Sequence, residues 1–143
     1  MQAAIDGIAS NIDGDSIIAI GIEGSANKLG IGIIRHNPKD NSTTILSNPR
    51  KTYIPPTGEG FLPRETAWHH QTHFVGLVKA ALIEAKVAPQ DINVICYTKG
   101  PGMGGPLVSA ATGARLLSLL WNNTPIVGVN HCIGRTFLTP FYF

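Results

Sequence analysis

Cysteine, charged residues and long apolar runs are all scarce in this chain. Two cysteines in 143 residues are too few for the disulfide framework of a small secreted protein, so we expect a reducing compartment. No apolar run approaches the ~18 residues of a membrane span, and the first residues lack the basic-then-apolar order of a signal peptide. The net charge is only +2 and the basic residues are scattered, which neither requires nor excludes a nucleic-acid partner. We therefore predict no membrane association and a location in the cytoplasm and nucleus.

Apolar residues are present in the amount that an ordinary globular domain needs. Hydrophobic residues make up 43% of the chain, and its length suits one domain with a core. Small and polar residues at 1–15 predict a flexible leader before the domain. The domain itself is expected over 16–134.

Isoleucine-rich runs, turn signals and helical periodicity predict an α/β fold. The expected elements, in chain order, are strands at 16–23, 29–35 and 43–53, a helix at 64–86, a strand at 92–97, a helix at 106–121 and a strand at 126–129. This order is that of the actin-like, ribonuclease H-like (ASKHA) domain. In such folds the hairpin between the first two strands binds phosphate, and here that hairpin turn falls on Gly24–Lys28.

A second glycine-rich turn, Tyr97–Pro106, lies between a predicted strand and a predicted helix. Glycines let the backbone approach a bound group, and the following helix offers unpaired N–H groups to an anion. The turn is not a Walker A motif, because no Gly-Lys-Ser/Thr follows. A phosphate-binding turn and a plain strand-to-helix connection both stay open here, as they do for Gly24–Asn27.

Histidines at two places in the sequence are candidate metal ligands. His69 and His73 share a helical face, but two histidines are fewer than the ligands that zinc needs, so a solvated or hydrogen-bonded face is preferred. His131 follows the last predicted strand, where ligands and catalytic groups often emerge in α/β proteins. Cys132 beside it carries a soft sulfur, although a structural role is preferred for both residues.

Five segments resemble, in the same order, segments of the tRNA threonylcarbamoyltransferases of eukaryotes and archaea. This family, once labelled O-sialoglycoprotein endopeptidase, provides the catalytic subunit of the KEOPS complex. The segments are GIEGSANK at 21–28, NPRKTY at 48–53, GFLP at 60–63 followed by His69 and His70, YTKGPGMG at 97–104, and GVNHCIG at 128–134. The resemblance covers about 17–134, which is nearly the whole chain.

The resemblance implies a protein of two related actin-like halves, of which this chain resembles the first. The implied reaction is transfer of a threonylcarbamoyl group from threonylcarbamoyl-adenylate to N6 of the adenosine that follows the anticodon in tRNA. The implied site residues are the catalytic Glu23, Ser25 and Asn27, the donor-binding Lys99, Gly100, Gly102 and Gly104, and the metal ligand His131. We expect position 102 to require glycine because a side chain there would block the approach of the donor. Gly102→Val is therefore expected to abolish activity and to spare the fold.

The resemblance also implies one divalent metal ion, iron or zinc, held by a His-x-x-x-His pair and an aspartate of the second half. His131 matches the first histidine, whereas Arg135 stands where the second belongs. A guanidinium stays protonated and cannot ligate a cation. Residues 135–143 resemble nothing in the family and form an atypical C-terminal tail. The expected protein is therefore a truncated and inactive form.

The implied partners are tRNA and the other KEOPS subunits, a small kinase/ATPase and small accessory proteins. A non-enzymatic alternative is a remnant that binds a partner through the helix at 64–86. The old endopeptidase label is disfavoured, because the chain contains no His-Glu-x-x-His sequence.

Overall fold

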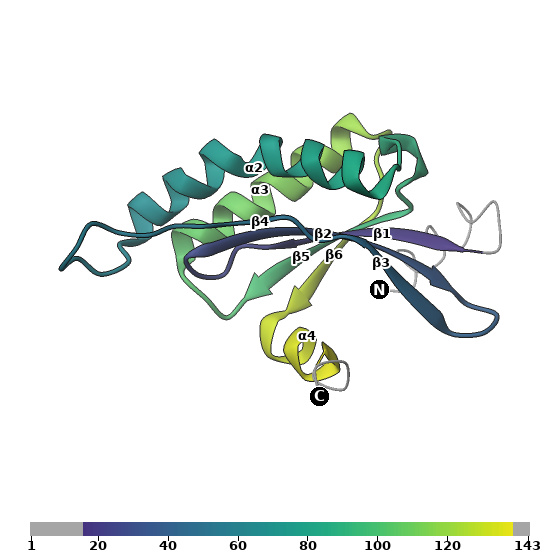
Figure 1. The fold of residues 1–143 in the computed structure, drawn as a ribbon, viewed down its shortest axis with the longest axis horizontal. Helices are drawn as coiled ribbons and strands as arrows, with labels where there is room; N and C mark the ends of the chain where they lie inside the picture. The colour runs from purple at the N-terminus through teal and green to yellow at the C-terminus, as the bar shows by residue number, and fades with distance from the viewer. Residues whose placement is uncertain (1–15, 139–143) are drawn as a thin grey trace.

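A mixed sheet forms the centre of the molecule. The computed structural model describes residues 16–138, with side chains described up to residue 134. The sheet has six strands in the order β3-β2-β1-β5-β6, with β4 paired to β2 (Figure 1). The strands are β1 (Ile17–Glu23), β2 (Lys28–Asn37), β3 (Ser42–Ser47), β4 (Arg50–Thr52), β5 (Val94–Gly100) and β6 (Ile126–Asn130). Strands β1, β5 and β6 run parallel, and β2 pairs antiparallel with β1, β3 and β4.

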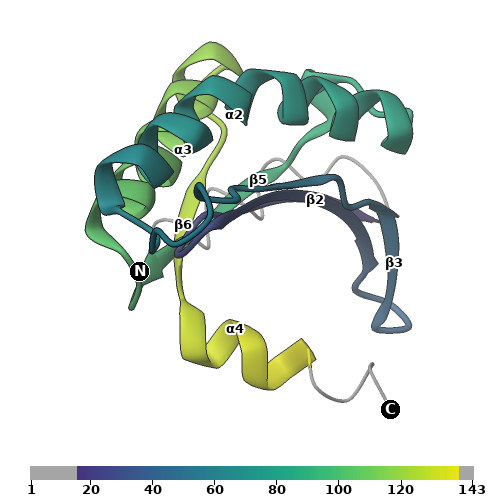
Figure 2. The ribbon, with the colours of Figure 1, turned by 60° about the vertical axis from the view of Figure 1, so that its left-hand side comes forward.

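Helices cover the two faces of the sheet unequally. Helices α2 (Pro63–Ala85) and α3 (Gly104–Leu120) lie side by side on one face, while α4 (His131–Leu138) lies on the opposite side (Figure 2). A single 3-10 turn, η1 (Pro89–Asp91), leads into β5. None of the helices in the described part of the chain is long and apolar enough to cross a membrane.

Alternation along β1 and β2 explains where the core lies. Ile20 and Ile22 of β1 pair with Ile33 and Ile31 of β2, and all four side chains are buried under α2 and α3. The residues between them, such as Gly21 and its partner Gly32, face the other side of the sheet. One face is therefore a packed isoleucine layer, and the opposite face is a shallow, glycine-lined surface.

Helix α2 has the apolar face that its periodicity predicts. Pro63 occupies the first turn, where its missing N–H costs nothing, and the helix ends at Lys86 in the left-handed conformation with φ 54°. The residues predicted for the buried face are buried or packed against the core; they are Ala67, Phe74, Val78, Ala81, Leu82 and Ala85.

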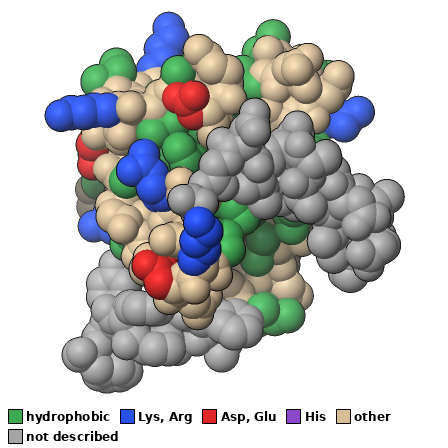
Figure 3. All heavy atoms as spheres, turned by 90° about the vertical axis from the view of Figure 1, so that its right-hand side faces the viewer, with side chains coloured by type: hydrophobic (Ala, Val, Ile, Leu, Met, Phe, Trp, Pro, Cys, Tyr) green, Lys and Arg blue, Asp and Glu red, His purple; other side chains and the backbone are tan. Residues whose placement is uncertain are grey.

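The outer faces of α2 and α3 carry exposed apolar side chains. The largest of these are Trp68, Val75 and Ile83 on α2 and Val108, Leu116 and Leu120 on α3. Figure 3 views the end of the molecule at the right of Figure 1, where apolar side chains gather between singly placed lysine and arginine side chains. Apolar surface of this kind is common at protein interfaces.

The predicted α/β, actin-like class and its element order are confirmed, with two local differences. The expected third strand is divided into β3 and β4, because Asn48-Pro49 interrupts it and proline has no N–H to donate. The second difference is α4 (His131–Leu138), a helix that was not among the expected elements and that spans the boundary expected at residue 134. The predicted leader at 1–15 and the residues 139–143 of the predicted tail lie outside the described residues.

Close packing of α2 against α3 depends on glycine at position 113, and this gives a first prediction. A Cβ on Gly113 would lie 2.3 Å from Cζ of Phe74, so the ring would have to move. We expect Gly113→Ala to lower the free energy of unfolding by about 1–3 kcal/mol, the usual cost of overpacking.

Urea denaturation followed by circular dichroism measures this effect. The matched control is Gly76→Ala on the exposed side of α2, where an added Cβ meets nothing within 4 Å. There alanine should stabilise the helix by up to ~1 kcal/mol. Equal unfolding midpoints for Gly113→Ala and the unchanged chain would contradict the packing argument.

Candidate active site

The carboxyl ends of three parallel strands bring polar side chains together. Glu23 is the last residue of β1, Thr98 lies near the end of β5, and His131 directly follows β6. Because β1, β5 and β6 run parallel, these ends meet at one edge of the sheet. This edge is where ligands bind in open α/β sheets.

The Glu23 carboxylate is the centre of the cluster. It accepts a hydrogen bond from the backbone N–H of Ser25 at 2.8 Å, and others from the hydroxyls of Ser25 and Thr98. Its second oxygen also lies 3.4 Å from Nδ1 of His131. Three elements distant in sequence are thus joined through one side chain.

These contacts keep Glu23 ionised. Burial by itself raises the pKa of this carboxyl, but the hydrogen bonds from Ser25 and Thr98 and the nearby His131 outweigh burial and lower the pKa below 4.5. At neutral pH the carboxylate therefore acts as a fixed acceptor. It also lies in contact with the His131 ring, 3.4 Å from Nδ1.

A hollow of about 630 Å³ opens beside the cluster on the glycine-lined face of the sheet. Its floor includes Gly21, Gly30 and Gly32, and Lys28 and Arg50 contribute to its wall. Glu23, Thr98 and His131 line the same hollow. A pocket of this size with a few convergent polar groups is typical of a small-molecule site.

The two predicted glycine turns touch each other directly. The carbonyl of Ser25 accepts a hydrogen bond from the N–H of Met103 at 2.7 Å. A Cβ on Gly102 would lie 2.5 Å from that same oxygen, so glycine here permits contact between the two turns. The expectation that Gly102→Val spares the fold is therefore wrong, because the valine side chain would force the turns apart.

The other predicted donor-binding residues, which are Gly100, Gly104 and Lys99, do not share one location. Gly100 has φ 138°, a value that glycine adopts and other residues avoid. Gly104 opens α3 with open space around it, and no side chain caps that helix. The stem of Lys99 lies near Gly128, on the opposite face of β5 from Thr98, so the structure does not bring Lys99 to Glu23.

Asn27 connects the first turn to the segment after β4. Its side-chain N–H donates to the carbonyl of Tyr53 at 3.3 Å, and its own carbonyl accepts from the N–H of Tyr53 at 2.7 Å. Of the three residues predicted to be catalytic, Glu23 and Ser25 thus belong to the cluster, whereas Asn27 fixes the shape of the turn.

Two residues that line the hollow, Thr98 and Asn130, were not singled out from the sequence. Thr98 donates to Glu23, and Asn130 accepts hydrogen bonds from the N–H groups of Cys132 and Ile133, which caps α4. Both lie at the carboxyl ends of predicted strands. Strand alternation places Thr98 on the glycine-lined face and would have identified it.

The histidines of α2 form a separate group that packs on the first turn. His69 and His70 face each other through their Nδ1 atoms at 3.2 Å, and the rings of His69 and His73 are 4.7 Å apart. His70 is 1% exposed, and a Cβ on Gly24 would lie 3.0 Å from its ring. Burial, followed by the neighbouring His69, lowers the pKa of His70 to about 4, so the ring is neutral at pH 7.

The residues of the candidate site do not fit a complete metal centre. Among residues 16–138 no group of three His, Cys, Asp or Glu side chains is placed to share an ion. Glu23 and His131 approach each other, but two ligands are fewer than a tightly bound iron or zinc requires.

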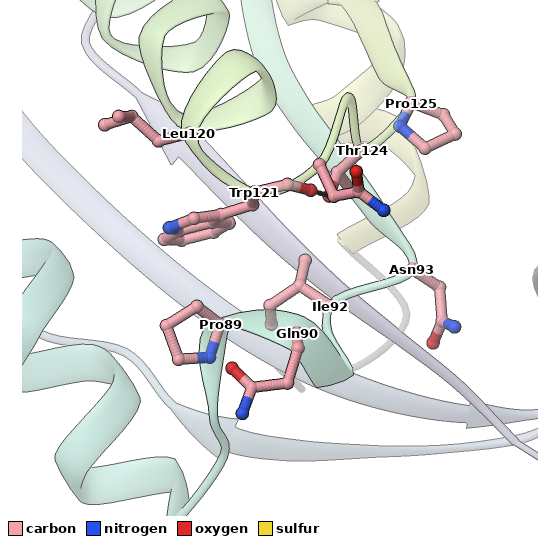
Figure 4. Close-up of a pocket in the computed structure, with 9 residues that line it drawn as sticks. Pro89, Gln90, Ile92, Asn93, Leu120, Trp121, Thr124 and Pro125 are labelled. Carbon is pink, nitrogen blue, oxygen red and sulfur yellow. Dashed lines mark hydrogen bonds between the residues drawn. The ribbon is translucent and has the colours of Figure 1, made fainter.

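A smaller hollow of about 340 Å³ lies far from the strand ends that carry Glu23 (Figure 4). Polar groups that line it are already engaged within the fold. The side-chain oxygen Oδ1 of Asn93 accepts a hydrogen bond from the N–H of Ile18, and the Thr124 hydroxyl donates to the carbonyl of Trp121. We therefore assign this hollow a structural role.

The ligand count generates the second prediction, which concerns metal binding. We expect the purified chain, after growth with added iron or zinc, to retain far less than one metal ion per molecule. Elemental analysis by mass spectrometry checks this, with His131→Ala as the variant and His36→Ala as the surface-histidine control. Near-stoichiometric metal that disappears only in His131→Ala would contradict the prediction.

Comparison with known proteins connects this geometry to a family. The family model described as "TsaD: tRNA N6-adenosine threonylcarbamoyltransferase" matches residues 44–139. A Gibberella zeae protein of the name "tRNA N6-adenosine threonylcarbamoyltransferase" is 62% identical over 120 residues, covering 84% of this chain and 34% of that protein. A Candida albicans protein of the same name is 58% identical over 125 residues, covering 85% of this chain and 33% of that protein.

Solved structures agree on the fold. YeaZ from Pseudomonas aeruginosa superposes with a TM-score of 0.57 at 16% identity, covering 80% of this chain and 44% of that one. The chain spans about a third of the length of the curated relatives that it matches. With the family model matching residues 44–139 and the identity to both fungal proteins, this chain belongs to the tRNA N6-adenosine threonylcarbamoyltransferase family.

Proposed function

We propose that this chain provides the N-terminal part of an enzyme that modifies tRNA by transferring a threonylcarbamoyl group. In this proposal the donor is threonylcarbamoyl-adenylate, and the acceptor is N6 of the adenosine that follows the anticodon. The observation that carries the proposal is the carboxylate cluster of Glu23, Ser25, Thr98 and His131, which lines the hollow at the strand ends.

The proposed transfer needs groups that bind the phosphate of the donor. The acceptor N6 attacks the carbamoyl carbon and forms a C–N bond. The bond between that carbon and the phosphate oxygen breaks, so that AMP leaves, and N6 loses a proton. The unpaired N–H groups at the start of α3, next to Gly104 and Gly105, suit the phosphate of the donor. Lys28 and Arg50, which line the hollow, add positive charge that attracts an anionic donor.

In this proposal Glu23 positions the His131 ring and does not itself accept a proton from substrate. Its lowered pKa makes it a poor acceptor of the N6 proton, but its contact with Nδ1 at 3.4 Å suits it to position the ring of His131. The ring is then held at the edge of the hollow, where its Nε2 is available to a ligand or to substrate. Ser25 and Thr98 keep the carboxylate in place.

The remaining features of the proposal come from the family resemblance. They are a divalent iron or zinc ion completed by residues outside this chain, assembly with the other KEOPS subunits, and a location in the cytoplasm and nucleus. Because the chain spans about a third of its relatives, we propose that it is inactive alone.

A non-catalytic module is the second candidate function. The exposed apolar side chains on the outer faces of α2 and α3, including Val75, Ile83, Leu116 and Leu120, support it. In this alternative the chain binds a partner protein through α2, and the Glu23 cluster is only structural.

A chimera distinguishes the two candidates and gives the third prediction. Residues 17–134 would replace the matching segment of the Gibberella zeae relative, and histidine would be placed at the position of Arg135. We expect this chimera to incorporate radiolabelled threonine into tRNA. We expect Ser25→Ala or Glu23→Gln in it to lower the rate by about 5–150-fold, which corresponds to the loss of a charged hydrogen bond worth about 1–3 kcal/mol.

The control is Glu84→Gln, which removes a carboxylate from α2 outside the cluster and should leave the rate unchanged. Folding of each variant is checked by its melting temperature. A folded chimera without activity would contradict the transferase proposal and favour the partner-binding module.

A further inference from the structure

Beside the first turn lies a group of rings that the Glu23 cluster does not use. Tyr53 and His69 have ring centroids 5.6 Å apart, and the His69 and His73 rings follow at 4.7 Å. Tyr53 comes from the segment after β4, and both histidines come from α2. All three side chains are half-buried, so each ring is held in place while part of it stays accessible.

Basic side chains on β4 and β2, near this ring group, have no acidic partner among the described side chains. Arg50 and Lys51 are exposed neighbours on β4, and β4 pairs with β2 next to Lys28. The ion pairs among the described side chains join Arg64 to Glu65 and His131 to Glu23, so none of these three basic residues is neutralised in this way. Their charge is therefore available to a phosphate backbone.

The basic residues connect the rings to the hollow. Lys28 and Arg50 line the hollow that contains Glu23, whereas Lys51 lies near enough to His69 to disfavour its protonated form. The register of β4 explains this division, because successive residues of a strand point to opposite faces. A strip of positive charge thus runs from the ring group over the β4 edge to the candidate active site.

The rings themselves are suited to stacking. Burial, together with His73 and Lys51, lowers the pKa of His69, so this imidazole is neutral at pH 7. The backbone bonds between Tyr53 and Asn27 anchor the tyrosine beside the first turn. Unpaired RNA bases stack on tyrosine and histidine rings, and Lys and Arg contact the adjoining phosphates.

We propose that Tyr53, His69 and His73, with Arg50 and Lys51, form a binding surface for single-stranded RNA next to the active site. The chemistry fits unpaired bases of a tRNA loop, which would stack on the rings while their backbone follows the basic strip toward the hollow. This inference rests on the proposed function, because that function makes tRNA the substrate. The inference goes beyond that function by naming the surface of this chain that binds the RNA.

Binding of a fluorescein-labelled RNA to the whole chain, followed by fluorescence anisotropy, tests this fourth prediction. The probe is a stem-loop with an unpaired loop, and the comparison probe is a fully paired duplex of the same length. We expect tighter binding of the stem-loop. Tyr53→Ala should weaken stem-loop binding by about 5–150-fold, the loss of one stacked base, whereas Tyr53→Phe keeps the ring and should retain affinity.

Charge removal supplies a second, independent readout. Lys51→Ala should reduce the slope of log affinity against log salt by about 0.7, as expected for one phosphate contact to a single strand. Lys79→Ala removes an exposed charge elsewhere on α2 and serves as the matched control, with no change in affinity expected. A loop containing 4-thiouridine should also cross-link to the peptides that carry Tyr53 or His69.

Three results would each contradict the proposed RNA-binding surface. They are equal affinities for the duplex and the stem-loop, an unchanged stem-loop affinity in Tyr53→Ala, and no detectable binding of the stem-loop. The outcome is separable from the proposed function. An active chimera whose rate is unaffected by Tyr53→Ala would leave the transferase proposal intact while removing this RNA surface.

Discussion

The carboxylate of Glu23 must be satisfied where three strand ends meet, and this requirement organises the site. A partly buried carboxylate is costly unless it accepts hydrogen bonds. Ser25 and Thr98 supply them, and His131 adds a partner from the start of α4. The same contacts couple the site to stability. Because the pKa of Glu23 is lowered on folding, its stabilising contribution is present above about pH 4.5 and is lost as the pH falls through the folded-state pKa.

A second constraint is the close approach of the two glycine turns. Gly102 lies against the backbone of Ser25, and Gly24 lies under the ring of His70. The first turn is therefore held from two sides, by the loop before α3 and by α2. This arrangement fixes Ser25 relative to Glu23, so that two glycines that do not line the hollow help to set its geometry through close packing.

Much of the fold was predictable from the sequence because alternation and helical spacing report burial directly. The isoleucines of β1 and β2 and the apolar face of α2 illustrate this. The division into β3 and β4 could also be read from Asn48-Pro49, although the pattern of apolar residues does not reveal it. By contrast, α4 was not predicted, because residues 135–143 were interpreted as an atypical tail, although apolar residues of 131–138 do fall on one helical face.

The site was predictable in part. Glu23, Ser25 and His131 were identified through the family resemblance, and the structure brings these three together. The contact between Gly102 and Ser25 joins residues far apart in the chain, so no local pattern could distinguish it from a ligand contact. The donor-binding role of Lys99 stays a prediction, and strand alternation puts this residue on the opposite face from Thr98.

The titration of Glu23 tests the central claim most directly. Carbon-13 NMR of the glutamate carboxyl groups in the whole chain yields this pKa, with the exposed Glu84 as an internal reference. We predict a pKa for Glu23 below 4.5 that rises in a Ser25→Ala/Thr98→Val double variant, because burial is then opposed by the backbone N–H of residue 25 and His131 without the two hydroxyl donors. A pKa at or above 4.5 in the unchanged chain, or one that the double variant leaves unaltered, would contradict the account.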